Sequence, residues 1–116
     1  MKIFTHGPEE TVRLGERLGR ALVGGEVVAL CGELGSGKTC FIKGLALGLG
    51  VADAEAVTSP SFVILREYKG RVPLYHIDLF RIDRAEEVPN LGLEEYLYGP
   101  GVCAVEWADK FPLILP

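Results

Sequence analysis

The chain has 116 residues, of which 48% are hydrophobic and 24% are charged, and its net charge is −4 at neutral pH. This length corresponds to one domain with a single core, and the composition excludes intrinsic disorder. The acidic balance argues against an extended nucleic-acid-binding surface, and no apolar run is long enough to span a bilayer. The lack of such a run leads us to expect no membrane contact. The three cysteines form no C-x-x-C pair, so we expect reduced thiols in a cytoplasmic protein.

The N-terminal segment is predicted to form a short edge strand near residues 2–5, followed by an amphipathic helix. Pro8 suits the first helical position, and two glutamates follow it where acidic groups complement the helix dipole. Apolar residues recur at helical spacing up to Leu22, and the two glycines at 24 and 25 end the helix. Residues 26–31 then form an apolar strand.

A glycine-rich motif, G-x-x-x-x-G-K-T, follows this strand and precedes a helix predicted over residues 38–49. The order strand, motif, helix is typical of a phosphate-binding P-loop. Its glycines let the backbone approach phosphate oxygens, Lys38 can reach the β- and γ-phosphates, and the Thr39 hydroxyl can hold Mg²⁺. The competing interpretation is a glycine-rich turn that contains Lys-Thr by chance. We predict that a nucleoside triphosphate is bound by the residues Glu33, Leu34, Gly35, Ser36, Gly37, Lys38, Thr39 and Cys40.

The second half of the chain is predicted to contain a hairpin and one further strand. Extended runs at residues 62–68 and 72–78 are separated by only three residues, too few for a crossover helix, so they should pair antiparallel. Short helices near residues 85–88 and 92–98 precede an apolar strand at residues 102–105. The predicted fold class is therefore α/β: a P-loop NTPase-like three-layer fold whose mostly parallel sheet carries an antiparallel hairpin, in one domain over the whole chain.

Two carboxylates stand at the ends of predicted strands. Asp78 closes the second hairpin strand, where P-loop proteins place a second Mg²⁺ contact, usually through water. Glu106 closes the last strand, and the carboxyl ends of strands in open α/β sheets face the ligand crevice. We therefore expect both acids to face the phosphates, with Glu106 holding Mg²⁺ or orienting the attacking water. An aspartate that starts a turn and a glutamate with a structural capping role are the alternatives.

The stretch Thr58–Ser61 lies between the P-loop helix and the hairpin, where nucleotide switches keep a loop whose hydroxyls sense the γ-phosphate and Mg²⁺. The alternative is that its Ser-Pro pair simply turns the chain. His76 should point to the same face of its strand as Asp78, where it could pack or bond near the site, although a lone histidine is more often structural. Arg71 is predicted to be a solvated surface charge rather than an arginine finger.

Two motifs of other nucleotide-binding proteins are absent from the sequence. There is no Asn-Lys-x-Asp to read a guanine base, and the residues after Asp78 lack the glycine of D-x-x-G, so an ordinary GTPase is disfavoured. No arginine-rich lid of the kind small-molecule kinases use is evident. An adenine nucleotide, either hydrolysed or used as a switch, fits best. A small-molecule or nucleoside kinase and a non-hydrolysing nucleotide-switch binding module remain as alternatives.

Four motifs occur in order along the chain: Gly32–Thr39, Thr58–Phe62, His76–Arg81 and Glu106-Trp107. Together they resemble the TsaE (YjeE-type) ATPases of bacterial tRNA threonylcarbamoyladenosine synthesis, and the resemblance extends over essentially the whole chain. It implies weak ATPase activity that depends on two partners, TsaD and TsaB. These partners place threonylcarbamoyl on adenosine 37 of tRNAs that read codons beginning with A. The chain would contact tRNA only indirectly, through them.

The resemblance also implies roles for particular residues, with ATP or ADP and Mg²⁺ as the bound cofactors. The two Mg²⁺ contacts of the family map onto Thr39 and Glu106, and its conserved acid maps onto Asp78. Its switch-like loop maps onto Thr58–Ser61, and the segment near residues 6–11 would lie by the adenine. The residues expected to act in catalysis are Lys38, Thr58, Asp78 and Glu106.

The chain departs from the family pattern at two places. Phe80 stands where the family usually has tyrosine, so no phenolic hydroxyl is available there. Family members normally continue beyond the position of Pro116, with a further strand and a basic nucleotide contact. Because the apolar residues 111–116 would otherwise leave an exposed patch, we expect a further C-terminal segment in the natural protein.

Overall fold

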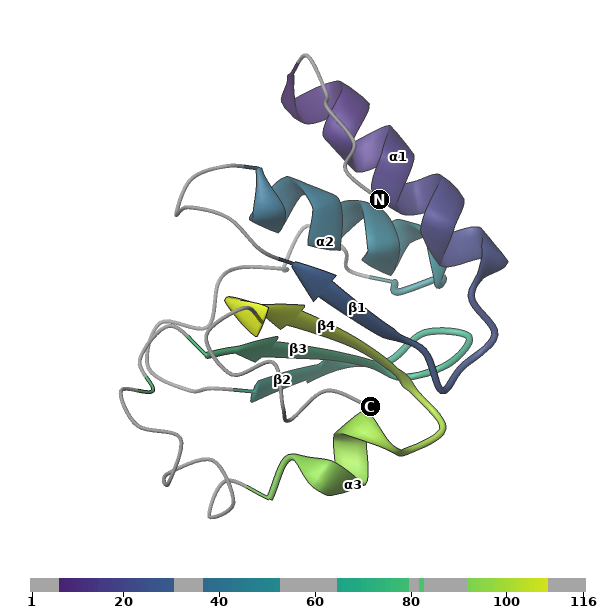
Figure 1. The fold of residues 1–116 in the computed structure, drawn as a ribbon. Coiled ribbons are helices and arrows are strands. Elements are labelled where there is room, and N and C mark those ends of the chain that lie inside the picture. Colours follow the sequence, from purple (N-terminus) through teal and green to yellow (C-terminus); the bar gives the residue numbers. More distant parts are fainter. Residues whose placement is uncertain (1–6, 31–36, 53–64, 80–81, 83–91, 109–116) are drawn as a thin grey trace.

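A computed structural model of the chain describes residues 7–30, 37–52, 65–79, 82 and 92–108 (Figure 1). Within these ranges, no helix has the length and apolarity to cross a bilayer. The helices and strands are α1 (Pro8–Ala21), β1 (Val27–Leu30), α2 (Lys38–Gly48), β2 (Leu65–Tyr68), β3 (Leu74–Asp78), α3 (Glu94–Leu97) and β4 (Val102–Glu106).

Most of the predicted elements are present, with shorter boundaries in places. The strand predicted to start at Val72 begins instead at Leu74, because Pro73 has no N–H to donate to a neighbouring strand. The last strand ends at Glu106, as predicted. The predicted edge strand at residues 2–5 and the predicted helix near residues 85–88 lie outside the described residues.

Within the described residues, the sheet has four strands in the order β1-β4-β3-β2. The β1–β4 and β4–β3 pairs are parallel, while β3 and β2 pair antiparallel as the predicted hairpin. Helices α1 and α2 lie over one face of the sheet and α3 lies over the other, which gives three layers (Figure 1). The prediction of a mostly parallel, three-layer α/β fold with one antiparallel hairpin is therefore confirmed.

The central strand β4 is buried on both faces, since all five of its residues are buried. On the α2 side, Val102 and Ala104 belong to an apolar cluster that includes Ile42 of α2. On the α3 side, Cys103 and Val105 pack with residues of and beside α3. Burial of both faces explains why the strand reads as a continuous apolar run rather than an alternating one.

Helix α1 packs against α2 through four glycines, which we call the glycine seam: Gly15 and Gly19 on α1, and Gly44 and Gly48 on α2. A Cβ atom at position 44 would lie 2.2 Å from the Val12 carbonyl oxygen, and one at position 15 would lie 2.3 Å from the carbonyl oxygen of Phe41. No real Cβ atom fits at such distances, so the two helix backbones are in direct contact. The sequence analysis did not predict this close packing.

Arg71, in the turn between β2 and β3, forms hydrogen bonds with backbone carbonyl groups at the C-terminal ends of α1 and α2. The Arg71 guanidinium donates from Nη1 to the Leu22 carbonyl at 2.9 Å and from Nη2 to the Gly19 carbonyl at 3.1 Å, and the Arg71 backbone N–H donates to the Leu49 carbonyl at 2.6 Å. A cation at this end also complements the dipole of α1. Arg71 is exposed as expected, but it also caps a helix, which the sequence analysis did not anticipate.

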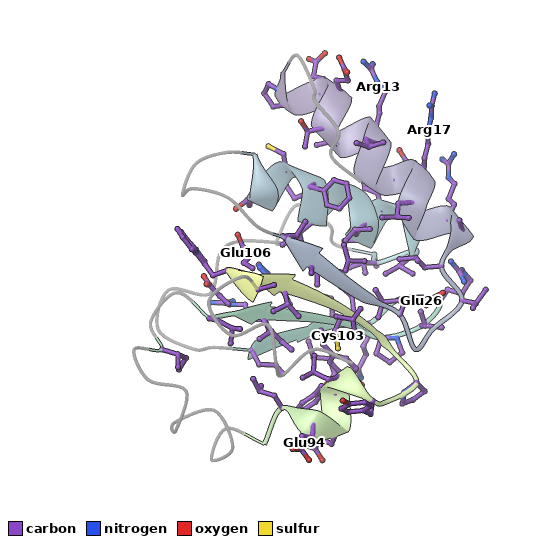
Figure 2. All side chains as sticks on the ribbon, viewed as in Figure 1. Arg13, Arg17, Glu26, Glu94, Cys103 and Glu106 are labelled. Carbon is purple, nitrogen blue, oxygen red and sulfur yellow. The ribbon has the colours of Figure 1, made fainter. Side chains whose placement is uncertain are left out.

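Glu26, which precedes β1, closes the turn after α1 (Figure 2). Its carboxylate accepts the N–H groups of Val23 at 3.0 Å and Gly24 at 2.7 Å. The hydrogen bond from Val23 is the largest of the causes that hold the pKa of Glu26 below its usual value. The hydrogen bond from Gly24 and the charge of Arg71 act in the same direction. The Glu26 carboxylate and the Arg71 guanidinium thus fix the segment between α1 and β1. This segment lies at the end of the sheet opposite to Glu106 (Figure 2).

The glycine seam predicts that a Gly44→Ala substitution destabilises the fold. Alanine in place of glycine at an open helical position normally stabilises by up to about 1 kcal/mol. At position 44 the added methyl group would overlap the α1 backbone, so we expect a net loss of about 1–3 kcal/mol in the free energy of unfolding, measured by urea denaturation. Gly7→Ala, where no atom lies within 4 Å of the added Cβ, is the control. An unchanged or higher stability of the Gly44→Ala variant would show that the helices are not held at backbone contact.

Candidate functional site

The last residues of three parallel strands, β1, β4 and β3, are paired side by side, and we call this row of paired residues the rung. Leu30, the last residue of β1, pairs with Glu106, the last residue of β4, and Glu106 pairs with Asp78, the last residue of β3. The first turn of α2 lies at this same edge (Figure 1). The register therefore places the two predicted acids on neighbouring strands, beside the point where the chain leaves β1 toward α2.

Both acids lie on the face of the sheet that α2 covers. Ala104 packs in the apolar cluster under α2, and side chains two residues apart on a strand share a face. Glu106 therefore points to the α2 side, and so do its pairing partner Asp78 and the pairing partner of Ala104, which is His76. Figure 2 shows Glu106 at the end of β4, near the first turn of α2.

Glu106 and His76 form a buried pair. The distance from His76 Nε2 to Glu106 Oε2 is 2.6 Å, and the two residues are 0% and 3% exposed. The second ring nitrogen of the histidine, Nδ1, is buried and has no hydrogen-bond partner in the part of the chain that the structure describes. A carboxylate buried so deeply needs such a donor, because an unpaired charge in the protein interior is strongly unfavourable. The expectation that His76 could bond near the site is thus realised in a contact to Glu106.

The N-terminus of α2 begins at Gly37, which adopts the left-handed conformation with φ 90°. Among the described residues, no side chain caps this end of the helix. The N–H groups of a helix's first turn favour an anion. Thr11 of α1 lies close to Gly37: its side-chain atoms are 3.8–3.9 Å from the position a Cβ would take there. The Thr11 hydroxyl donates to the Gly7 carbonyl at 3.0 Å, within the first turn of α1.

The predicted nucleotide-binding residues are only partly described. Lys38 begins α2, and Thr39 and Cys40 follow in its first turn, both partly buried. The first four P-loop residues of the predicted set, Glu33, Leu34, Gly35 and Ser36, lie outside the described residues, as does Thr58 with the rest of its loop. The structure therefore brings together Asp78, Glu106 and the start of α2 at one edge of the sheet.

Two features of the site were not predicted. The first is the partner of His76, which lies 30 residues away along the chain and becomes evident only once β3 and β4 are paired. The second is Trp107, whose φ of 59° is left-handed although it is not glycine. Such strained residues are often found at functional sites, and here the strain turns the chain immediately after Glu106. Neither feature has a local signal in the sequence.

Cys103 is outside the site and has a structural role. Its thiol donates to the Tyr96 carbonyl at 3.0 Å, and burial raises the pKa of Cys103 to about 11. The thiol is therefore protonated at neutral pH and unreactive. Cys40, by contrast, is partly exposed in the first turn of α2. Both are free thiols, as the sequence analysis expected.

These features define a class of protein. Strand β1, the glycine-rich segment and α2 are followed by two acids on neighbouring parallel strands, within a three-layer sheet. This is an α/β protein with the P-loop NTPase-like fold.

Comparison with known proteins gives the family. The model of the family "Threonylcarbamoyl adenosine biosynthesis protein TsaE" matches residues 5–116, and the chain belongs to this TsaE family. A TsaE protein of Treponema pallidum is 45% identical over 116 residues, which cover 100% of this chain and 84% of the relative. A TsaE protein of Bacillus subtilis is 44% identical, covering 100% of this chain and 72% of its own.

A solved structure is also similar to the fold. The crystal structure of YdiB from Bacillus subtilis superimposes with a TM-score of 0.75 at 42% sequence identity. The match covers 97% of this chain and 67% of that chain. At this identity the likeness extends beyond the fold to the family, in agreement with the sequence relatives.

Proposed function

We propose that this protein binds ATP together with Mg²⁺ and hydrolyses it slowly, as the ATPase component of tRNA threonylcarbamoyladenosine synthesis at adenosine 37. The observation that carries the proposal is the rung formed by Leu30, Glu106 and Asp78 beside the start of α2. The pathway is that named for the TsaE family and for the relatives of this chain. TsaD and TsaB are the proposed partners, tRNA is reached through them, and the cytoplasm is the proposed location.

The phosphates would be bound at the start of α2. The N–H groups of its first turn carry the positive end of the helix dipole, which favours an anion. Lys38 begins this helix and is proposed to neutralise the β- and γ-phosphates, while residues 33–37 wrap around them. The left-handed Gly37 supports this role, because at φ 90° a side chain would be strained.

The available donors fit Mg²⁺. Thr39, Asp78 and Glu106 offer a hydroxyl and two carboxylates, and Mg²⁺ prefers oxygen ligands, usually one or two carboxylates supplemented by nucleotide phosphates. Thr39 and Glu106 are the proposed direct ligands, with Asp78 in the outer shell. When bound, the ion would neutralise charge that develops on the transferred phosphoryl group.

We propose that the isolated chain hydrolyses ATP slowly because its site is incomplete without the partners. Catalysis of phosphoryl transfer is mostly positioning and charge stabilisation, so a site that lacks one component turns over slowly. We propose that Asp78 and Glu106 orient the metal and the attacking water. The Thr58–Ser61 loop is proposed to report loss of the γ-phosphate to the partners, whose binding would complete the site.

The proposal predicts that Lys38→Ala reduces ATP hydrolysis in the presence of TsaD and TsaB by roughly 100-fold or more, because a major charge contact to the phosphates is lost. The wild-type chain should be slow alone, faster with the two partners, and selective for ATP over GTP. Phosphate release is the measurement. Lys43→Ala, on the same helix, is the matched control and should behave like wild type.

Wild-type turnover by the Lys38→Ala variant would remove the P-loop from the mechanism. Phosphate transfer to an added small-molecule acceptor, rather than to water, would favour the kinase alternative. Tight ATP binding without turnover under any condition would favour a nucleotide-switch binding module.

The two described thiols give a second test, which reports binding rather than turnover. In a Cys31→Ser background, iodoacetamide should label Cys40 and leave Cys103 unmodified, because burial raises the pKa of Cys103 to about 11. ATP with Mg²⁺ should slow the labelling of Cys40 severalfold, since the nucleotide would cover the first turn of α2. Mass spectrometry of the labelled peptides gives both rates. Equal labelling of Cys40 with and without nucleotide would contradict binding at this helix end.

A further inference from the structure

We infer that His76 is a positioning residue for the Glu106 carboxylate, which it holds in the orientation that binds the magnesium ion of the nucleotide complex. This inference deepens the proposed function and rests on it. It assigns His76 no contact with nucleotide or metal, only with the carboxylate that the proposal makes a ligand.

The contact is set by the register of the two central strands. His76 pairs with Ala104, two residues before the rung that joins Asp78 to Glu106, and all four side chains share the α2 face. The imidazole reaches along this face to Glu106, with 2.6 Å between Nε2 and Oε2. Because β3 and β4 are paired along their whole length, the backbone fixes both ends of the contact.

The hydrogen-bonding pattern assigns the direction of this contact. An ionised carboxylate can only accept, so Nε2 must carry the proton and donate it to Oε2. The other nitrogen, Nδ1, is buried and has no hydrogen-bond partner among the described residues. Within that part of the chain, the ring therefore makes its hydrogen bond to Glu106 alone.

The physical consequence is that Glu106 is preorganised. A free glutamate would have to give up side-chain freedom when it binds an ion, and a buried one lacking a donor would lose the hydrogen bond that favours its charged form. With Oε2 held by His76, the orientation of the whole carboxylate group is set before the ion arrives. Hydrogen bonds of this kind to metal ligands typically contribute 10-fold to 100-fold in metal affinity.

A purely structural role for His76 is less consistent with its surroundings. Leu74, which precedes His76 on the α2 face of β3, packs in the same apolar cluster as Val102 and Ala104. A leucine at position 76 would be apolar too and would bring no unpaired nitrogen into the core. Among the described residues, the imidazole makes one hydrogen bond, to Glu106, and leaves its other nitrogen without a partner. Histidine at this position is therefore best explained by its contact with the Glu106 carboxylate.

The test uses substitutions that differ in whether an N–H group still reaches Glu106. His76→Gln places an amide nitrogen at the position of Nε2, whereas His76→Asn is too short and His76→Leu has no donor. Tyr68→Phe is the control, because it removes a second buried side-chain atom that has no hydrogen-bond partner among the described residues, the Tyr68 hydroxyl, from the apolar cluster under α2. Binding of a fluorescent ATP analogue is measured with and without Mg²⁺, and thermal unfolding of each variant is recorded.

We expect His76→Asn and His76→Leu to weaken the apparent Mg²⁺ affinity about 10-fold or more, with the affinity for Mg²⁺-free nucleotide changed less than about twofold. His76→Gln should recover most of the loss, and Tyr68→Phe should match wild type. If one of the two donor-free variants does not fold, the other serves for the comparison with His76→Gln.

Unchanged Mg²⁺ affinity in a folded donor-free variant would overturn the inference. So would equal losses in the Gln and Asn variants, or parallel losses with and without Mg²⁺, because these would indicate a general structural role. Failure of the proposed function has a different signature: Mg²⁺ would then fail to strengthen nucleotide binding by the wild-type protein itself.

Discussion

The parallel pairing of β4 with both β1 and β3 is the constraint on which the rest of the structure depends. It aligns Leu30, Glu106 and Asp78 on one rung, so that both acids meet the end of the strand that leads to α2. Because β4 is buried on both faces, its register is fixed by two apolar clusters at once. A slip by one residue would turn Glu106 toward α3 and move every side chain of β4 to the wrong face.

Helix α1 is held against α2 by close backbone contacts rather than by large side chains. The glycine seam brings α1 against α2, and Arg71 binds the carbonyl groups at the end of α1. At the other end of the pair, Thr11 lies beside Gly37. The start of α2 is therefore fixed relative to the sheet edge that carries Glu106, which is the geometry that a phosphate and its metal require.

Local patterns in the sequence predicted most helices and strands. The order of the strands and the contacts between distant residues could not be predicted, because they depend on long-range pairing. The hairpin followed from a gap too short for a helix, and α2 from the glycine motif before Lys38. That β4 lies between β1 and β3 could not be read from the sequence, because strand order depends on contacts between distant segments. The contact of His76 with Glu106 was hidden for the same reason. The glycine seam was visible as two Gly-x-x-x-Gly spacings, but only packing shows that they face each other.

The most direct measurement is a crystal structure of the protein with Mg²⁺ and a non-hydrolysable ATP analogue. If the proposed function is correct, we expect phosphates at the first turn of α2 and a metal ion about 2.0–2.1 Å from oxygens of Thr39 and Glu106. Asp78 should lie within reach of water bound to that ion, and the contact between His76 and Glu106 should persist. A nucleotide bound elsewhere, or the carboxylates of Asp78 and Glu106 turned away from the phosphates, would contradict it.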